Sequence, residues 1–185
     1  WESPATLRYA KLAPIKIDRG ALWHWMPTRP LFVSPQHRLL VRSRIVARMT
    51  DAPEALVAAK KLVGMPGITQ TAPKGMLRYF HILCDRHEIV FAEGAPAETL
   101  LPGPQAKRAL SAQAWQEITT IFPEIDDVLS SYPPARAILR GAQTKTLVER
   151  QIKNGRDLVE TNLTAHGKGQ GRNRAALAAV CMAAE

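Results

Sequence analysis

The sequence predicts a mainly β fold that is followed by an α-helical C-terminal tail. In the first half of the chain, short apolar stretches alternate with turn residues, and recurring prolines oppose long helices. After Pro104 the apolar residues recur at helical spacing instead. We therefore expect a β domain over residues 1–103 and a helical tail over residues 104–185.

Several strands are expected in the β domain. Residues 13–18 alternate between apolar and polar side chains and end before Gly20, as a half-buried strand does. Residues 54–63 are ambiguous, since their composition also permits a short helix between strands. Three further apolar stretches are predicted strands: 31–33, 38–42 and 45–49.

Residues 76–84 and 88–92 are rich in aromatic and β-branched side chains, which favour strands. The polar residues 85–87 separate them. This arrangement predicts a β-hairpin.

The tail is expected to hold helices at intervals. Ser111 is a plausible N-cap for a helix that Pro123 ends. A further helical turn is expected within 126–132, and a longer helix over 144–161. A basic, glycine-rich linker over 166–174 would then lead to an alanine-rich helix over 175–184.

Composition excludes several classes of protein. The formal net charge is +9, but no run of five like charges occurs and few aromatic residues lie among the bases, so nucleic acid is not the favoured partner. The two cysteines, Cys84 and Cys181, cannot form a disulfide framework, and no C-x-x-C pair suggests structural zinc. No apolar stretch approaches the roughly 20 residues that span a bilayer. We expect no cofactor, no metal and no membrane span.

Two segments carry candidate chemistry. Ser34 stands three residues before His37, directly ahead of an apolar stretch, so a proline turn can bring hydroxyl and imidazole together. An imidazole can protonate the leaving nitrogen of a peptide bond. His81 lies within the second segment, between Phe80 and Ile82, and His87 lies in the turn that follows.

These segments resemble motifs of the Hint domain, the self-cleaving module of hedgehog proteins and inteins. VSPQHRLLV resembles the motif with Ser or Thr three residues before His, and YFHILCDRHEIVFAEG resembles the motif that closes the domain. APIKIDRGAL, ALVAAKKLVG and FPEI occur in the order of the bacterial hedgehog/intein subgroup. The resemblance covers roughly residues 8–150.

The resemblance implies a horseshoe-like β fold and autoprocessing. In the family, a cysteine at the first position attacks the preceding carbonyl, the peptide becomes a thioester, and a second nucleophile releases the upstream segment. By resemblance, Ser34 would bond the scissile amide, His37 would activate and protonate it, and His81 would assist the shift. His87 would match the late histidine of the closing motif. The partner would be the upstream segment of the same polypeptide in cis.

One departure is serious, because the family's first strand and its cysteine have no counterpart here. The chain begins with Trp1, and neither Cys84 nor Cys181 stands at a motif position. We therefore expect an N-terminally incomplete Hint domain that does not cleave by itself. Domains of this type commonly occur in larger proteins that bacteria export, but the sequence itself does not show whether the parent protein is secreted, and the oligomeric state stays open.

Other interpretations remain open for each residue. His37 and His81 can be packed histidines, Ser34 can simply open a turn, and His87 can be a turn residue. Three imidazoles could hold zinc, but their separation offers no ligand signature. At the level of function, the alternatives are a non-catalytic Hint-like interaction module that uses the basic helical tail, and nucleic-acid binding by the same tail.

Overall fold

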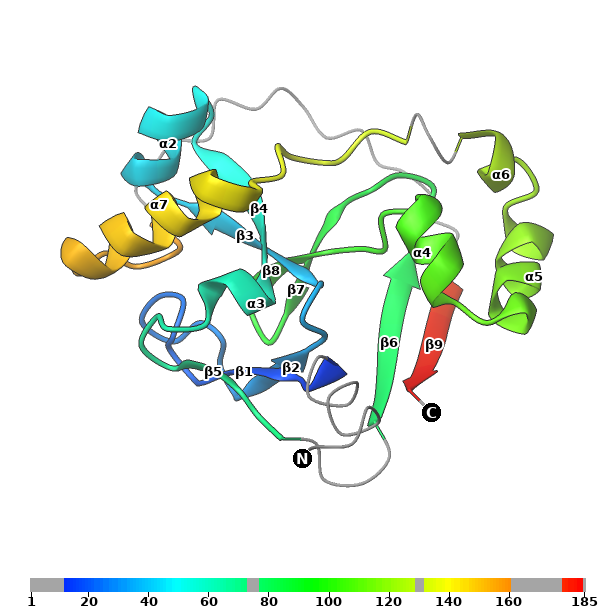
Figure 1. The fold of residues 1–185 in the computed structure, drawn as a ribbon, viewed down its shortest axis with the longest axis horizontal. Coiled ribbons are helices and arrows are strands. Elements are labelled where there is room, and N and C mark those ends of the chain that lie inside the picture. Colours follow the sequence, from blue (N-terminus) through cyan, green and yellow to red (C-terminus); the bar gives the residue numbers. More distant parts are fainter. Residues whose placement is uncertain (1–11, 73–76, 129–131, 161–177, 185) are drawn as a thin grey trace, which may run out of the picture.

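The computed structural model describes residues 12–72, 77–128, 132–160 and 178–184. Its strands form antiparallel sheets, as expected for a β-rich fold, and helices cover them. In Figure 1 a larger body holds two of the sheets, and a smaller layer with β6, β9, α4, α5 and α6 stands beside it.

The first sheet has the order β2-β1-β5, formed by Leu31–Val33, Ile15–Ile17 and Ile68–Gln70. The two isoleucines of β1 are fully buried, whereas Lys16 between them pairs with Asp18 at 2.8 Å. The two-residue alternation thus correctly predicted this strand.

The second sheet has the order β4-β3-β8-β7, formed by Glu54–Ala58, Arg38–Arg42, Ala95–Glu98 and Ile89–Ala92. β3 lies in its middle. Its three central residues are buried without alternation, because other elements cover both of its faces.

The predicted strand over 45–49 is wrong. Arg44–Thr50 is a helix, α2, because the Ser43 hydroxyl accepts a hydrogen bond from the Val46 amide at 3.1 Å and caps its first turn. The ambiguous residues 54–63 form strand β4 and then a short helix, α3 (Ala59–Leu62).

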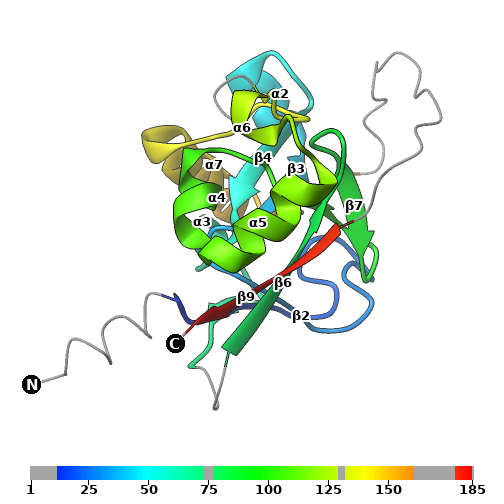
Figure 2. The same cartoon turned by 90° about the vertical axis from the view of Figure 1, so that its right-hand side faces the viewer.

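The predicted hairpin between residues 76–84 and 88–92 is also wrong. Strand β6 (Leu77–Leu83) pairs with β9 (Ala178–Ala184), while β7 pairs with β8. The tight turn lies at Glu93 and Gly94, whose φ angles of 51° and 80° are both left-handed, as hairpin turns require. Figure 2 shows β6 and β9 side by side.

Strand β9 also corrects the predicted helix over 175–184. Alanine has the highest helix propensity, but tertiary context overrides propensity, and here residues 178–184 pair with β6 as a strand. The predicted linker over 166–174 lies outside the described residues.

The remaining helices are α4 (Pro104–Ala109), α5 (Ala112–Ile121), α6 (Ile125–Val128) and α7 (Gly141–Lys153). Ser111 caps α5 as predicted, accepting from the Ala114 amide at 3.1 Å. Helix α7 begins and ends earlier than the predicted range 144–161. None of the helices in the described ranges is long and apolar enough to cross a membrane.

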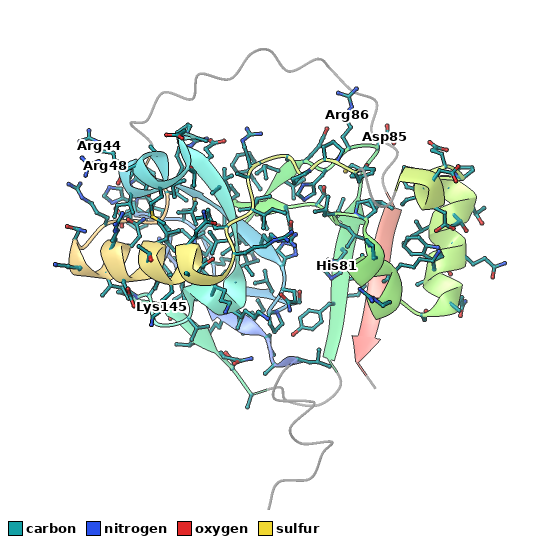
Figure 3. All side chains as sticks on the ribbon, turned by 45° about the horizontal axis from the view of Figure 1, so that its top comes forward. Arg44, Arg48, His81, Asp85, Arg86 and Lys145 are labelled. Atoms are coloured by element: carbon teal, nitrogen blue, oxygen red, sulfur yellow. The ribbon has the colours of Figure 1, made fainter. Side chains whose placement is uncertain are left out.

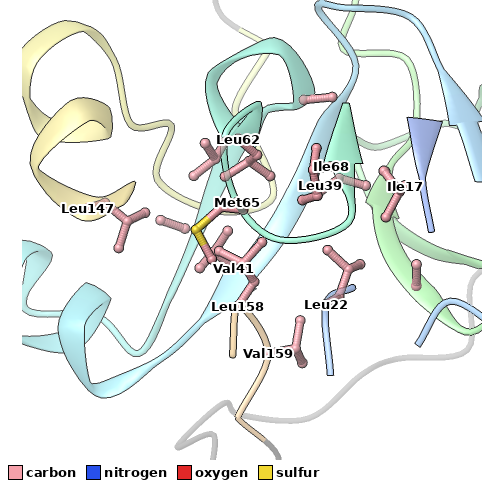
Figure 4. Close-up of a cluster of buried hydrophobic side chains, with 14 of the residues drawn as sticks. Ile17, Leu22, Leu39, Val41, Leu62, Met65, Ile68, Leu147, Leu158 and Val159 are labelled. Carbon is pink, nitrogen blue, oxygen red and sulfur yellow. The ribbon is translucent and has the colours of Figure 1, made fainter. Parts of the chain in front are cut away.

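One main core joins both sheets to α7 and the segment after it (Figure 4). Leu147 and Leu158 pack there with residues of β1 and β3. A smaller cluster gathers Leu83 with Ile118, Phe122 and Ile125. The main core thus contains residues from both sides of position 103, and the division there stays a prediction from the sequence.

Candidate functional site

A tight turn connects Ser34 to His37. The His37 amide donates to the Ser34 carbonyl at 3.0 Å, which closes the turn around Pro35. The first residues of helix α3 bind this turn through two backbone hydrogen bonds. The Ala59 amide donates to the His37 carbonyl at 2.8 Å, and the Lys60 amide donates to the Pro35 carbonyl at 3.0 Å. His37 is therefore fixed at the start of β3.

The His37 and His81 rings meet although His37 lies just before β3 and His81 belongs to β6. Their centroids lie 5.8 Å apart, and the ring planes are tilted by 38°. His81 projects from β6 near the middle of the molecule (Figure 3). Its strand neighbours Phe80 and Ile82 are exposed, in keeping with the alternation of side chains along a strand.

Both histidines are held in the neutral form near neutral pH. Burial lowers the pKa of His37 from 6.5 to about 4, and the positive charges that His81 and Arg38 can carry lower it further, while Glu98 opposes the shift. Burial also lowers the pKa of His81. A neutral imidazole has one nitrogen that accepts a hydrogen bond and one that donates.

The Nε2 atom of His81 is buried and has no hydrogen-bond partner among the described residues. Buried polar atoms are nearly always paired, so an unpaired one calls for an explanation.

His87 is placed differently from the other two. Its side chain is fully buried, and its Nδ1 accepts from the Ala135 amide at 2.8 Å. The ring proton must then sit on Nε2, which donates to Glu98 Oε2 at 3.1 Å. Both ring nitrogens are therefore already engaged within the protein.

Glu98 is a member of this cluster that the sequence did not reveal. It ends β8 and is 7% exposed, and its carboxylate accepts from the Arg38 amide at 2.9 Å and the Arg38 guanidinium at 2.7 Å. The only signal was an acidic residue at the end of a short, otherwise apolar segment.

Ser34 opens the turn that leads to His37. Of the four residues predicted from the sequence, His37 and His81 are thus in contact, Ser34 is joined to His37 through the backbone, and His87 reaches them through Glu98 and Arg38.

Neither cysteine belongs to the cluster of His37, His81, His87 and Glu98 that the described contacts define. Cys84 is buried, and burial raises the pKa of its thiol, so the reactive thiolate is disfavoured. Cys181 belongs to β9, where it is paired with Phe80 in the strand register.

The arrangement can serve proton transfer to and from one reacting group. Two adjacent neutral imidazoles provide an acceptor and an N–H donor within the same small volume. In the parts of the chain that the structure describes, no group of three or more His, Cys, Asp or Glu residues is arranged to hold a metal ion.

Comparison with known families gives one match. A family model described as Hint domain matches residues 3–104, which is more than half of the chain and includes the His37 and His81 segments. This match confirms the resemblance that the motifs indicated. No curated protein and no solved structure matches the chain.

Proposed function

Because the chain belongs to the Hint domain family, we propose that the His37–His81 contact is the acyl-transfer site of an autoprocessing domain. The observation that carries the proposal is the pair itself: two neutral imidazoles from distant segments of the chain, one with a buried nitrogen that has no partner among the described residues. The substrate is a peptide bond of the same polypeptide, held in cis.

The proposed step is an N-to-S acyl shift. A cysteine thiol attacks the carbonyl carbon of the peptide bond before it, forming the carbon–sulfur bond as the carbon–nitrogen bond breaks. One imidazole takes the thiol proton and, as the imidazolium, gives a proton to the leaving amine nitrogen, while the N–H of the other imidazole donates a hydrogen bond to the scissile peptide. The thioester is then open to water or another nucleophile, which releases the upstream segment.

Ser34 and His87 have supporting roles in this proposal. The Ser34 hydroxyl would hydrogen-bond the scissile amide, and the closed turn would keep Ser34 close to His37. With both nitrogens engaged, His87 would orient the site and not take part in the proton transfer.

We further propose that the nucleophilic cysteine comes from a segment outside these 185 residues. Two observations support this. Cys84 is buried, and the pKa of its thiol is raised. In addition, neither Cys84 nor Cys181 stands at the position that the family's motif gives to the nucleophile, directly after the scissile peptide bond. The chain alone would then hold the proton-transfer groups of the site without its thiol.

The proposal is tested on the protein with the residues that its gene encodes before Trp1. Self-cleavage is followed by mass spectrometry for the wild type, His37→Ala and His81→Ala. General acid–base groups contribute on the order of 10²–10⁴-fold, so each variant should slow release by at least about a hundredfold. His24→Ala is the matched control, because this exposed histidine lies outside the cluster and its loss should leave the rate unchanged.

Two results would overturn the proposal. One is release at the wild-type rate after either substitution. The other is an upstream segment without cysteine and no release at all, which would favour the non-catalytic interaction module.

A further inference from the structure

We infer that Glu98 is a positioning residue whose ionised carboxylate ties His87, Arg38 and the start of β3 into one unit and so holds His37 against His81. This inference rests on the proposed function of the histidine pair. Glu98 itself would touch neither the peptide bond nor the thiol.

The geometry requires a carboxylate at this position. Three donors converge on its two oxygens: the Arg38 amide on Oε1, and the Arg38 guanidinium and His87 Nε2 on Oε2. An ionised carboxylate is acceptor-only, so it satisfies all three. The side chain is nearly buried, and leaving any of these donors unpaired there would be costly.

An amide of the same shape cannot replace the carboxylate. Its NH₂ group would face either the Arg38 amide or the donors at Oε2, and all of these are donors themselves. His87 cannot resolve the conflict by moving its proton, because its Nδ1 accepts from the Ala135 amide. The network therefore depends on the charge of Glu98 as well as on its shape.

The connection to His37 is short. The amide that Glu98 holds belongs to Arg38, the next residue after His37, and a second hydrogen bond fixes the His37 carbonyl to Ala59. By fixing the backbone next to His37, Glu98 thus restricts the orientation of the His37 side chain. Its loss would loosen the contact with His81.

Glu98 also supplies the one favourable charge for a protonated His37. The charged or titratable groups that act on His37 are Glu98 from β8, His81 from β6, Arg38 from β3 and His87 from the loop before β7. Among these groups of the described residues, only Glu98 raises the pKa of His37, and the others lower it. A transient imidazolium in the proposed step would therefore depend on Glu98.

The carboxylate stays ionised despite its burial. Burial raises the pKa of Glu98, but the hydrogen bond from His87 and the charge of Arg38 outweigh this, and the net pKa lies below its ordinary value. The negative charge is consequently present over the pH range in which the protein would act.

The test compares Glu98→Gln with Glu93→Gln. Glu93 lies in the turn between β7 and β8 and bonds Thr28 and Arg29 at the surface, so its substitution makes the same chemical change on the same hairpin away from the histidines. NMR of ¹⁵N-labelled histidine reports the tautomer of His87 and the titration of His37 in the 185-residue chain. The rate of release is measured in the protein with its upstream segment.

We expect the wild type and Glu93→Gln to show the Nε2–H tautomer of His87. In Glu98→Gln the His87 signal should change, and the pKa of His37 should fall further. Release should slow by at least about tenfold, which is less than the rate enhancement that a general acid–base group itself supplies. The acid limb of the pH–rate profile should move to lower pH, which a merely structural defect would not cause.

Unchanged His87 and His37 signals in folded Glu98→Gln would overturn the inference. If that variant does not fold, the wild-type protein still tests the inference. An Nδ1–H tautomer of His87 in the wild type would contradict the hydrogen bond from His87 Nε2 to Glu98. If the NMR changes appear as expected but the wild-type protein never releases its upstream segment, the network stands and the proposed function fails.

Discussion

Leu147 of helix α7 should be essential to the stability of the whole described fold. Its side chain is fully buried in the main core, where α7 packs against α2 and α3. Replacing it with alanine removes three side-chain carbons and leaves a cavity that the surrounding sheet and helices can fill only in part.

The expected loss follows from this burial. A buried leucine that is cut to alanine typically costs about 2–5 kcal/mol in free energy of unfolding. For a chain of this size, each kcal/mol shifts the melting temperature by about 2–4 °C, so the midpoint should fall by roughly 4–20 °C. Ile152, on the same helix and 47% exposed, is the matched control, and its change to alanine should cost well under about 1 kcal/mol.

Urea unfolding and thermal unfolding, followed by circular dichroism and tryptophan fluorescence, measure the free energy and the melting temperature of both variants. We expect a single transition for the wild type, shifted as a whole in Leu147→Ala, because Trp23 packs on the same core. The reasoning is refuted if Leu147→Ala unfolds like Ile152→Ala, or if only a second, separate transition moves.

Two further predictions concern the backbone and the titration of the site. Gly20→Ala should destabilise the fold more than Gly155→Ala, as measured by urea unfolding: both glycines have positive φ angles, 78° and 56°, but a Cβ at residue 20 would overlap the His24 carbonyl oxygen, whereas nothing lies near residue 155. Equal losses would contradict this. Stability should fall as pH drops from 6.5 towards 4, because the pKa of His37 is about 4 in the folded protein and the unfolded chain binds the proton first. The slope contributed by His37 is up to about 1.4 kcal/mol per pH unit. His37→Gln should therefore reduce the fall in stability, while His81, whose pKa is also lowered, keeps part of it; an unchanged fall would contradict this.

The sequence predicted the elements that depend on local patterns. The alternation over 13–18 predicted β1, and Ser111 with its downstream apolar spacing predicted α5. The motif around His37 and the segment around His81 correctly indicated the family. In each case the signal lies within a few neighbouring residues.

Elements that depend on distant partners were missed. The segment over 178–184 has a composition that suits a helix, and only β6 makes it a strand. The same pairing takes β6 away from the predicted hairpin with β7. The residue preferences of one segment carry no information about which other strand will pair with it.

Glu98 was missed for a similar reason. Its role depends on His87, eleven residues earlier, and on Arg38, sixty residues earlier, which the sheet brings to the same point. The α2 helix is a different case, because Ser43 gave a local capping signal that the β-branched composition of the segment obscured.

The most direct test of the account is a double-substitution cycle on His37 and His81 in the protein with its upstream segment. If the two imidazoles serve one proton transfer, removing both should slow release about as much as removing the more important one. Rate losses that multiply in the double variant would show that the two histidines act independently, and would contradict a single site at their contact.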